Sequence, residues 1–188
     1  MEKDLKQIPS SLFRVVLYGP ESTGKTTLTK QLAAHYQTVC VEEFARDYLQ
    51  KKWNQKKEVC TQADLAVIVS GQLQLENQAI ANANQILFCD TNVVVTRVWS
   101  ETHFDGYCDP QIIAYSEQFQ YDLYFLTGID VPWQKDDLRD RPNDRQMMFD
   151  YFKNTLDKLQ KNYVLLQGNQ EQRLEKAIGV IDQLLKKT

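Results

Sequence analysis

The stretch from Phe13 to Leu28, FRVVLYGPESTGKTTL, constrains the fold of this chain more than any other. An apolar run typical of a strand ends at Gly19, a short polar loop follows, and a helical pattern begins near Gly24. The loop fits the pattern G-x-x-x-x-G-K-[ST], which is the phosphate-binding P-loop when it joins a strand to a helix. The sequence therefore predicts an α/β protein that binds a nucleoside triphosphate.

Each residue type in this loop has a physical reason. Gly19 and Gly24 permit backbone conformations that a Cβ disfavours, so successive N–H groups can converge on one anion. The next helix points its positive end at the same place. Lys25 adds a mobile charge for the β- and γ-phosphates, and Thr26 offers a hydroxyl to Mg²⁺. We expect the nucleotide to contact Gly19, Glu21, Ser22, Thr23, Gly24, Lys25, Thr26 and Thr27.

The composition is that of an ordinary globular protein, and a length of 188 residues suggests a single domain over residues 1–188. A net charge of −3 gives no indication of a nucleic-acid or anionic-membrane partner. No segment has the apolar length of a signal peptide or a membrane span, so we expect a cytoplasmic protein. The scattered cysteines favour free thiols over zinc or disulfides: Cys40, Cys60, Cys89 and Cys108.

Short unbroken apolar runs alternate with helical patterns along the chain. Such runs are typical of strands buried on both faces, so the alternation predicts a parallel sheet with helices on each side. We expect strands at 13–18, 38–42, 86–89, 121–126 and 163–166. Helices are expected at about 24–36 and 61–82 and at 171–187. Two more are expected to begin near 93 and near 110, and another to end near 160. A charged connector is expected at 51–58.

Ligands of parallel sheets bind at the carboxyl ends of the strands, so polar residues just after each strand are candidates for chemistry. Asp90 follows four apolar residues, as in a Walker B strand, and its carboxylate would hold Mg²⁺ opposite Thr26. Glu43 follows the second strand and is a candidate general base for a substrate hydroxyl. The alternatives are that Asp90 is an ordinary strand exit and that Glu43 is a carboxylate at a helix N-terminus.

The polar segment at 128–143, rich in Asp and Arg, follows the fourth expected strand and has the character of a mobile lid. Arg139, Arg141 and Arg145 would surround the γ-phosphate and exclude water when such a lid closes. Alternatively, neighbouring aspartates pair with these arginines in solvent. The two interpretations are compatible if the aspartates pair with the arginines only until nucleotide binds. Three tryptophans are candidates for stacking on an aromatic ring, although most tryptophans are simply packed: Trp53, Trp99 and Trp133.

Several classes of P-loop protein can be compared. A GTPase would need a guanine-reading N-K-x-D, which the sequence lacks, and an AAA-type motor would need a longer chain with a helical domain. A regulatory ATPase needs no second pocket beside the phosphates. A small-molecule kinase needs a P-loop, a carboxylate for Mg²⁺, an acid near the acceptor and a lid with arginine, and all four are present. The sequence therefore favours a kinase, with a regulatory ATPase as the alternative.

Several blocks of the chain together resemble the NadR-type ribosylnicotinamide kinase family: GPESTGKTTL, EEFARDY, CDTN with TRVWSE, and YDLYFLTGIDVPWQKDDLRDRP. The resemblance extends from the first strand through the lid and is that of a stand-alone kinase. It implies a P-loop kinase fold, a three-layer α/β/α structure with a five-stranded parallel sheet. It also implies ATP- and Mg²⁺-dependent phosphorylation of the ribose 5′-hydroxyl of nicotinamide riboside, giving nicotinamide mononucleotide in NAD salvage. Another nucleoside or hydroxylated metabolite is the alternative acceptor.

The resemblance assigns roles by position. Glu43, Arg46 and Tyr48 match an E-x-x-R-x-Y element, Asp90 and Thr91 match the start of D-T-D, and Arg139 matches the arginine of D-x-L-R. Asn92 replaces the second Asp of D-T-D, and Asp137 replaces a Gly in the lid. We expect catalytic roles for Lys25, Glu43, Asp90 and Arg139, with nucleotide contacts from Arg141 and acceptor contacts from Glu43, Arg46, Tyr48, Asp90, Asn92 and Trp99. The sequence leaves open whether Glu43 or Asp90 is the base, and it predicts no oligomeric state.

Overall fold

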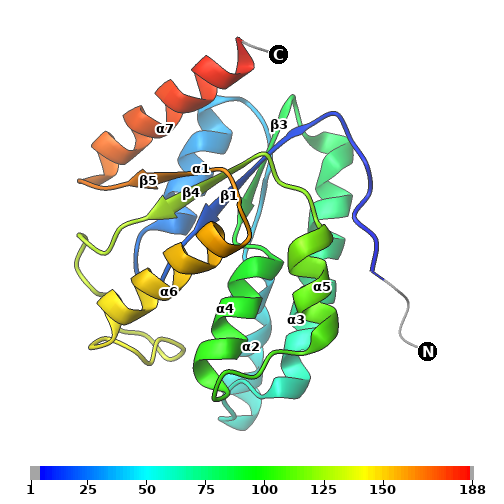
Figure 1. The fold of residues 1–188 in the computed structure, drawn as a ribbon, viewed down its shortest axis with the longest axis vertical. Helices are drawn as coiled ribbons and strands as arrows, with labels where there is room; N and C mark the ends of the chain where they lie inside the picture. Colours follow the sequence, from blue (N-terminus) through cyan, green and yellow to red (C-terminus); the bar gives the residue numbers. More distant parts are fainter. Residues whose placement is uncertain (1–4, 187–188) are drawn as a thin grey trace.

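The computed structural model describes residues 5–186, and its centre is a five-stranded parallel sheet (Figure 1). Each neighbouring pair of strands is parallel, and the strand order is β2-β3-β1-β4-β5. The strands are β1 (Phe13–Tyr18), β2 (Cys40–Val41), β3 (Ile86–Asp90), β4 (Leu123–Thr127) and β5 (Tyr163–Leu166). The predicted α/β class and five-stranded parallel sheet are confirmed.

Helices cover both faces of the sheet (Figure 1). One face packs against α1 (Lys25–His35) and α7 (Gln170–Leu185). The other packs against α3 (Gln62–Ala79), α4 (Val93–His103), α5 (Pro110–Gln118) and α6 (Arg145–Lys158). α2 (Phe44–Lys56) has no fully buried residue and packs against α3, where the ring of Phe44 occupies the space beside Gly71.

Alternate residues of β1 divide between two hydrophobic cores. Val16 and Tyr18 face α3 to α6, whereas Val15 and Leu17 face α1 and α7. All four side chains are completely buried. Because both faces of the strand are covered, its sequence is a continuous apolar run rather than an alternating one. The predicted three-layer α/β/α arrangement is therefore confirmed.

Some predicted boundaries were wrong. Most of the expected connector at 51–58 belongs to α2, because a helix without a buried side chain has no apolar stripe to indicate it. β2 is only two residues long, since it lies at the sheet edge and pairs with β3 alone. β4 begins at Leu123, and a 3₁₀ turn (Ile80–Asn82) completes the helix expected up to 82. Residues 1–4 of the polar lead-in and residue 187 of the expected last helix lie outside the described residues.

The four cysteines are free, with Cys89 and Cys108 buried and Cys40 and Cys60 partly exposed. Within residues 5–186, no three or more His, Cys, Asp or Glu side chains gather closely enough to hold a metal ion. In the same range, no helix combines the length and apolar character needed to cross a membrane.

Candidate active site

The P-loop joins β1 to α1 at the carboxyl edge of the sheet. Gly19 and Gly24 have positive φ angles of 136° and 82°. A Cβ on Gly19 would lie 2.7 Å from the Oγ1 atom of Thr127, so both its conformation and its close packing require glycine. A Cβ on Gly24 would meet nothing within 4 Å, so only the backbone conformation requires glycine there. The predicted glycine roles agree with this geometry.

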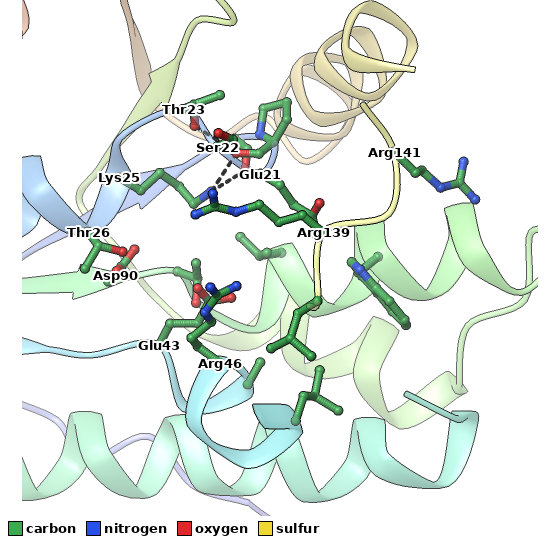
Figure 2. Close-up of a pocket in the computed structure, with 18 of the residues that line it drawn as sticks. Glu21, Ser22, Thr23, Lys25, Thr26, Glu43, Arg46, Asp90, Arg139 and Arg141 are labelled. Carbon is green, nitrogen blue, oxygen red and sulfur yellow. Dashed lines mark hydrogen bonds between the residues drawn. The ribbon is translucent and has the colours of Figure 1, made fainter. Parts of the chain in front are cut away.

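Lys25 is the first residue of α1, and its side chain folds back over the loop. Its ammonium group donates hydrogen bonds to the carbonyl oxygens of Gly19 (2.9 Å) and Pro20 (2.7 Å), as Figure 2 shows. The cation therefore lies at the mouth of the loop, against backbone groups and close to the positive end of α1. An anion bound in the loop would meet both charges.

Two carboxylates lie below Lys25 in the view of Figure 2. Asp90, the last residue of β3, is 2% exposed, and neither of its oxygens makes a hydrogen bond of ordinary geometry within the described residues. Burial raises the pKa of Asp90, while Lys25 and the neighbouring hydroxyl of Thr26 lower it. Burial also raises the pKa of Glu43, which Lys25 lowers and the charge of Asp90 raises further. The two acids and the lysine thus form one electrostatic group.

The segment between β4 and α6 lies over the cavity and is held there by Asp136. This carboxylate accepts hydrogen bonds from both terminal nitrogens of Arg46 on α2, and its Oδ2 atom lies 3.1 Å from Nε of Arg139. Arg139 also donates to the carbonyl of Gln134 (2.6 Å). The predicted pairing of arginines with aspartates is therefore present, and Arg139 extends toward the phosphate-binding loop (Figure 2).

One cavity of about 1090 Å³ connects these groups. Its polar end lies at the P-loop, and apolar side chains extend it between α2, α3 and α4: Leu49, Trp53, Leu65, Ile68, Val95 and Trp99. Most of the predicted site residues line it: Gly19, Glu21, Ser22, Thr23, Gly24, Lys25, Thr26, Thr27, Glu43, Arg46, Asp90, Trp99, Arg139 and Arg141. Segments separated by more than a hundred residues therefore meet at one site.

The structure does not place Tyr48 and Asn92 in this cavity. The hydroxyl of Tyr48 donates to Asp64 (2.8 Å), which joins α2 to α3. Asn92 is 1% exposed, donates to the hydroxyl of Tyr124 (3.0 Å) and accepts from the backbone N–H of Val94 (3.1 Å). The acceptor contacts predicted for these two residues therefore disagree with the geometry, because both side chains already hold the scaffold together.

Two predicted lid arginines also have other positions. Arg141 borders the cavity, but its side chain points away from the P-loop (Figure 2) and donates to Thr102 and His103 of α4. Arg145 is the first residue of α6 rather than part of a lid, and its guanidinium donates to the carbonyl of Val131 (2.8 Å). Arg145 also lines the cavity and donates to the carbonyl of Ser22 in the P-loop (3.4 Å). Arg139 and Arg145 therefore both lie close to the loop, and movement of this segment remains a prediction.

Sequence reasoning missed two features of the cavity wall. The ring of His103 stacks on Trp99 with centroids 4.0 Å apart and planes 9° apart, which covers one face of that tryptophan. The spacing of four residues on one helix was a signal for this contact. Burial and the charge of Asp140 raise the pKa of Glu21 to about 7, against the lowering influence of Lys25. No sequence pattern indicated that this carboxyl would be enclosed.

The fold and the site together define an α/β protein with a P-loop and the five-stranded parallel sheet of the P-loop kinase fold. A family model described as an AAA domain matches residues 14–173, and the chain belongs to that family. The proteins called "Trifunctional NAD biosynthesis/regulator protein NadR" from Salmonella typhimurium and Escherichia coli are each 30% identical to it over 125 residues. That match covers 66% of this chain and 30% of each relative, so the chain spans under a third of the curated relatives' length.

Solved structures show the same fold. NadR in complex with NR superposes with a TM-score of 0.73 at 21% identity, covering 92% of this chain and 51% of that one. NadR in complex with NAD and AMP-PNP gives 0.71 at 23% identity, covering 92% and 49%. Thymidylate kinase from Ehrlichia chaffeensis superposes with a TM-score of 0.64 at 14% identity, covering 92% of this chain and 100% of that one. The resemblance to the NadR-type family is confirmed by the two curated NadR relatives, and the solved structures show that the fold is shared.

Proposed function

We propose that the protein is an ATP- and Mg²⁺-dependent kinase that phosphorylates the ribose 5′-hydroxyl of nicotinamide riboside and gives nicotinamide mononucleotide. The observation that carries this proposal is the single cavity in which Lys25 lies beside the carboxylates of Glu43 and Asp90. The NadR relatives support the choice of ligands, because one was solved with NR and another with NAD and AMP-PNP.

The P-loop would bind the triphosphate of ATP through its backbone N–H groups and the N-terminal end of α1. Lys25 would exchange its two carbonyl contacts for oxygens of the β- and γ-phosphates, which are stronger acceptors because they carry charge. Arg139 would leave Asp136 and add a second cation at the γ-phosphate. These cations oppose the charge of the phosphoryl group that is transferred.

The residues present fit Mg²⁺. Asp90 keeps two buried oxygens without hydrogen bonds of ordinary geometry in the described part of the chain, beside the hydroxyl of Thr26. Mg²⁺ is usually held by one or two carboxylates together with substrate phosphates, so a cluster of protein ligands is not required. When bound, Mg²⁺ would neutralise charge on the β- and γ-phosphates.

Phosphoryl transfer then needs one proton acceptor for the 5′-hydroxyl. The hydroxyl oxygen forms a bond to the γ-phosphorus, the bond from this phosphorus to the β,γ-bridging oxygen breaks, and ADP leaves. Either Glu43 or Asp90 takes the proton. Burial raises the pKa of Glu43, which makes it a better proton acceptor than an exposed acid, whereas bound Mg²⁺ would lower the pKa of Asp90.

The apolar part of the cavity would receive the aromatic ring of the acceptor. Trp99 lines this part, with one ring face against His103 and the ring of Phe104 at 5.8 Å between centroids, and the rest of its indole would contact a ligand. Arg46 lines the polar side of the same space and would contact the sugar. Another nucleoside or hydroxylated metabolite is the alternative acceptor, and a regulatory ATPase is the alternative class.

One incubation separates these possibilities. The protein is mixed with ATP, Mg²⁺ and a panel of nucleosides that includes nicotinamide riboside, and products are weighed by mass spectrometry. We expect nicotinamide riboside to gain one phosphate faster than the other nucleosides. Phosphorylation of a different nucleoside would contradict the proposed acceptor but support the proposed kinase activity. Release of inorganic phosphate alone would favour the regulatory ATPase.

A further inference from the structure

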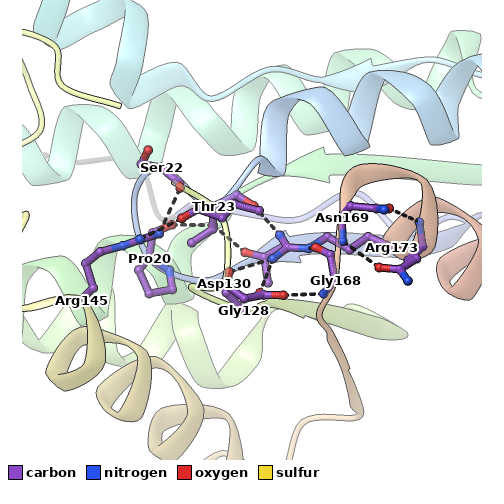
Figure 3. A network of polar contacts seen from close by, with 12 residues as sticks. Pro20, Ser22, Thr23, Gly128, Asp130, Arg145, Gly168, Asn169 and Arg173 are labelled. Atoms are coloured by element: carbon purple, nitrogen blue, oxygen red, sulfur yellow. Dashed lines mark hydrogen bonds and ion pairs between the residues drawn. The ribbon is translucent and has the colours of Figure 1, made fainter. Parts of the chain in front are cut away.

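Arg173 of α7 is a buried cation to which the proposed reaction has given no role. Only 3% of its surface is exposed. It lies behind the P-loop, where the loops that follow β1, β4 and β5 meet (Figure 3). Its partner Thr23 is 150 positions away in the sequence, so the contact depends entirely on the fold.

The guanidinium of Arg173 holds one carbonyl from each of these three loops. It donates from Nη1 to Thr23 (2.7 Å), from Nη2 to Gly128 (3.1 Å) and from Nε to Gly168 (2.9 Å). Nη2 also pairs with the carboxylate of Asp130. All three nitrogens are therefore used, and a planar guanidinium is the side chain whose donors diverge in this way.

The contact with Thr23 determines how the loop presents its backbone. The peptide between Thr23 and Gly24 is trans, so the carbonyl of Thr23 and the N–H of Gly24 point in opposite directions. Since Arg173 holds that carbonyl at the back of the loop, the N–H of Gly24 must point away from Arg173. Gly24 lines the cavity, and this N–H is one of the groups that converge on a bound anion.

We propose that Arg173 is a positioning residue for nucleotide binding, which fixes the peptide between Thr23 and Gly24 so that the N–H of Gly24 faces the triphosphate. The hydroxyl of Thr23 contacts Pro20 (2.8 Å) and Thr127 (2.7 Å), but these contacts hold the side chain rather than the carbonyl. This proposal relies on the proposed nucleotide and is independent of the identity of the acceptor.

The test is the affinity of the whole protein for AMP-PNP with Mg²⁺, measured by calorimetry. We expect Arg173→Lys to weaken binding about tenfold, because a single ammonium cannot reach all three carbonyls and the peptide becomes free to rotate. The matched control is Arg14→Lys. Arg14 is also buried, at 6% exposure, and donates to the carbonyl of Ile8 (2.5 Å) at the opposite edge of the sheet. We expect that variant to lower the melting temperature with binding unchanged.

The outcomes are distinct. A role confined to the scaffold would lower the melting temperature of Arg173→Lys and leave its affinity for AMP-PNP equal to that of the wild type, which would overturn the proposal. Arg173→Gln is the second variant, and circular dichroism establishes that it is folded. Failure of both variants to fold would also overturn the proposal in favour of a scaffold role. If the wild-type protein binds no AMP-PNP, both this proposal and the proposed function are contradicted. If the wild type binds AMP-PNP but phosphorylates no acceptor, the proposed function fails while the effect of Arg173 on nucleotide binding still stands.

Discussion

The carboxylate of Asp136 is paired with the guanidinium of Arg46, which joins the segment after β4 to the first turns of α2. The same carboxylate contacts Arg139, so one acid holds two cations at the edge of the cavity. In the absence of phosphate, these two cations share this one carboxylate. A triphosphate would compete with Asp136 for them, and that competition would couple nucleotide binding to the position of the segment.

Asp136→Asn should loosen this segment. The three side chains are partly exposed, so the loss of global stability should be about 1 kcal/mol or less. We expect faster trypsin cleavage after Arg139 in the absence of nucleotide, with protection restored by ATP. Asp137→Asn is the control, because Asp137 contacts only the side chain amide of Gln50 among the hydrogen bonds of the described residues (3.3 Å). Equal cleavage of both variants would show that Asp136 does not hold the segment.

Lys25→Ala should abolish turnover while leaving the protein folded. The substitution removes the cation at the mouth of the loop, where transition-state charge would develop, and we expect kcat to fall at least about a hundredfold. Lys153→Ala is the control, because Lys153 forms an exposed pair with Asp157 on α6 and does not line the cavity. Initial rates and circular dichroism check both variants. Normal turnover by Lys25→Ala would contradict the proposed mechanism.

The rate of phosphoryl transfer should fall as the solution is acidified. This fall should begin at a higher pH than it would if the general base were an exposed carboxylate. Burial raises the pKa of Glu43, and a general base is inactive when it is protonated. Activity is therefore present above the raised pKa and lost as the pH falls through it. The pH profile of kcat for Glu43→Gln and Asp90→Asn, at saturating Mg²⁺, identifies the base as the residue whose loss removes the acidic limb. Both assignments fail if neither variant loses substantial turnover.

Glu76 should make the folded state less stable as pH rises from 4.5 to about 7. This carboxyl is 2% exposed and accepts hydrogen bonds from the hydroxyl of Tyr121. Burial raises its pKa from 4.5 to about 7, against the lowering effects of Tyr121 and Arg14. Between these two values the folded state binds more protons than the unfolded state, so the free energy of unfolding falls as pH rises.

Urea unfolding at pH 5 and pH 8 measures this effect. We expect Glu76→Gln to be more stable than the wild type at pH 8 by on the order of 1 to 3 kcal/mol, with a smaller difference at pH 5. The exposed variant Glu175→Gln should leave the dependence on pH unchanged. A difference between wild type and Glu76→Gln that is the same at both pH values would contradict the assignment.

Asn92→Asp should leave the KM for the acceptor nearly unchanged. Asn92 faces the scaffold, and an aspartate there could still cap α4 and accept a hydrogen bond from the hydroxyl of Tyr124. Acceptor titrations at saturating ATP provide the measurement. A large change in KM would show that this position reads the acceptor, as the resemblance to the D-T-D element predicted.

The sheet could be predicted from the sequence because its strands are continuous apolar runs that carry their own signal. β1 and β5 have the expected boundaries, Phe13–Tyr18 and Tyr163–Leu166. α2 was missed because it packs against α3 without a fully buried residue and so carries no apolar stripe. The edge strand β2 was overestimated because β propensity does not show how many residues a neighbouring strand will pair with.

The candidate site was predictable where motif and strand end coincide, as at Lys25, Glu43 and Asp90, which share one cavity. Tyr48 and Asn92 belong to matching motifs too, but a motif does not indicate which way a side chain points. Arg173 could not be found from the sequence, because its three carbonyl partners are backbone atoms of distant loops and leave no pattern in residue types.

Because α2 has no fully buried residue, the side chains that would contact the acceptor can change without a change in the core that stabilises the fold. Leu49 and Trp53 of this helix line the acceptor end of the cavity, yet neither belongs to the fully buried core. Redesign of the acceptor preference could therefore begin on α2 with little loss of stability. Its limit is Gly71 of α3, where any larger residue would displace the ring of Phe44 and shift the whole helix.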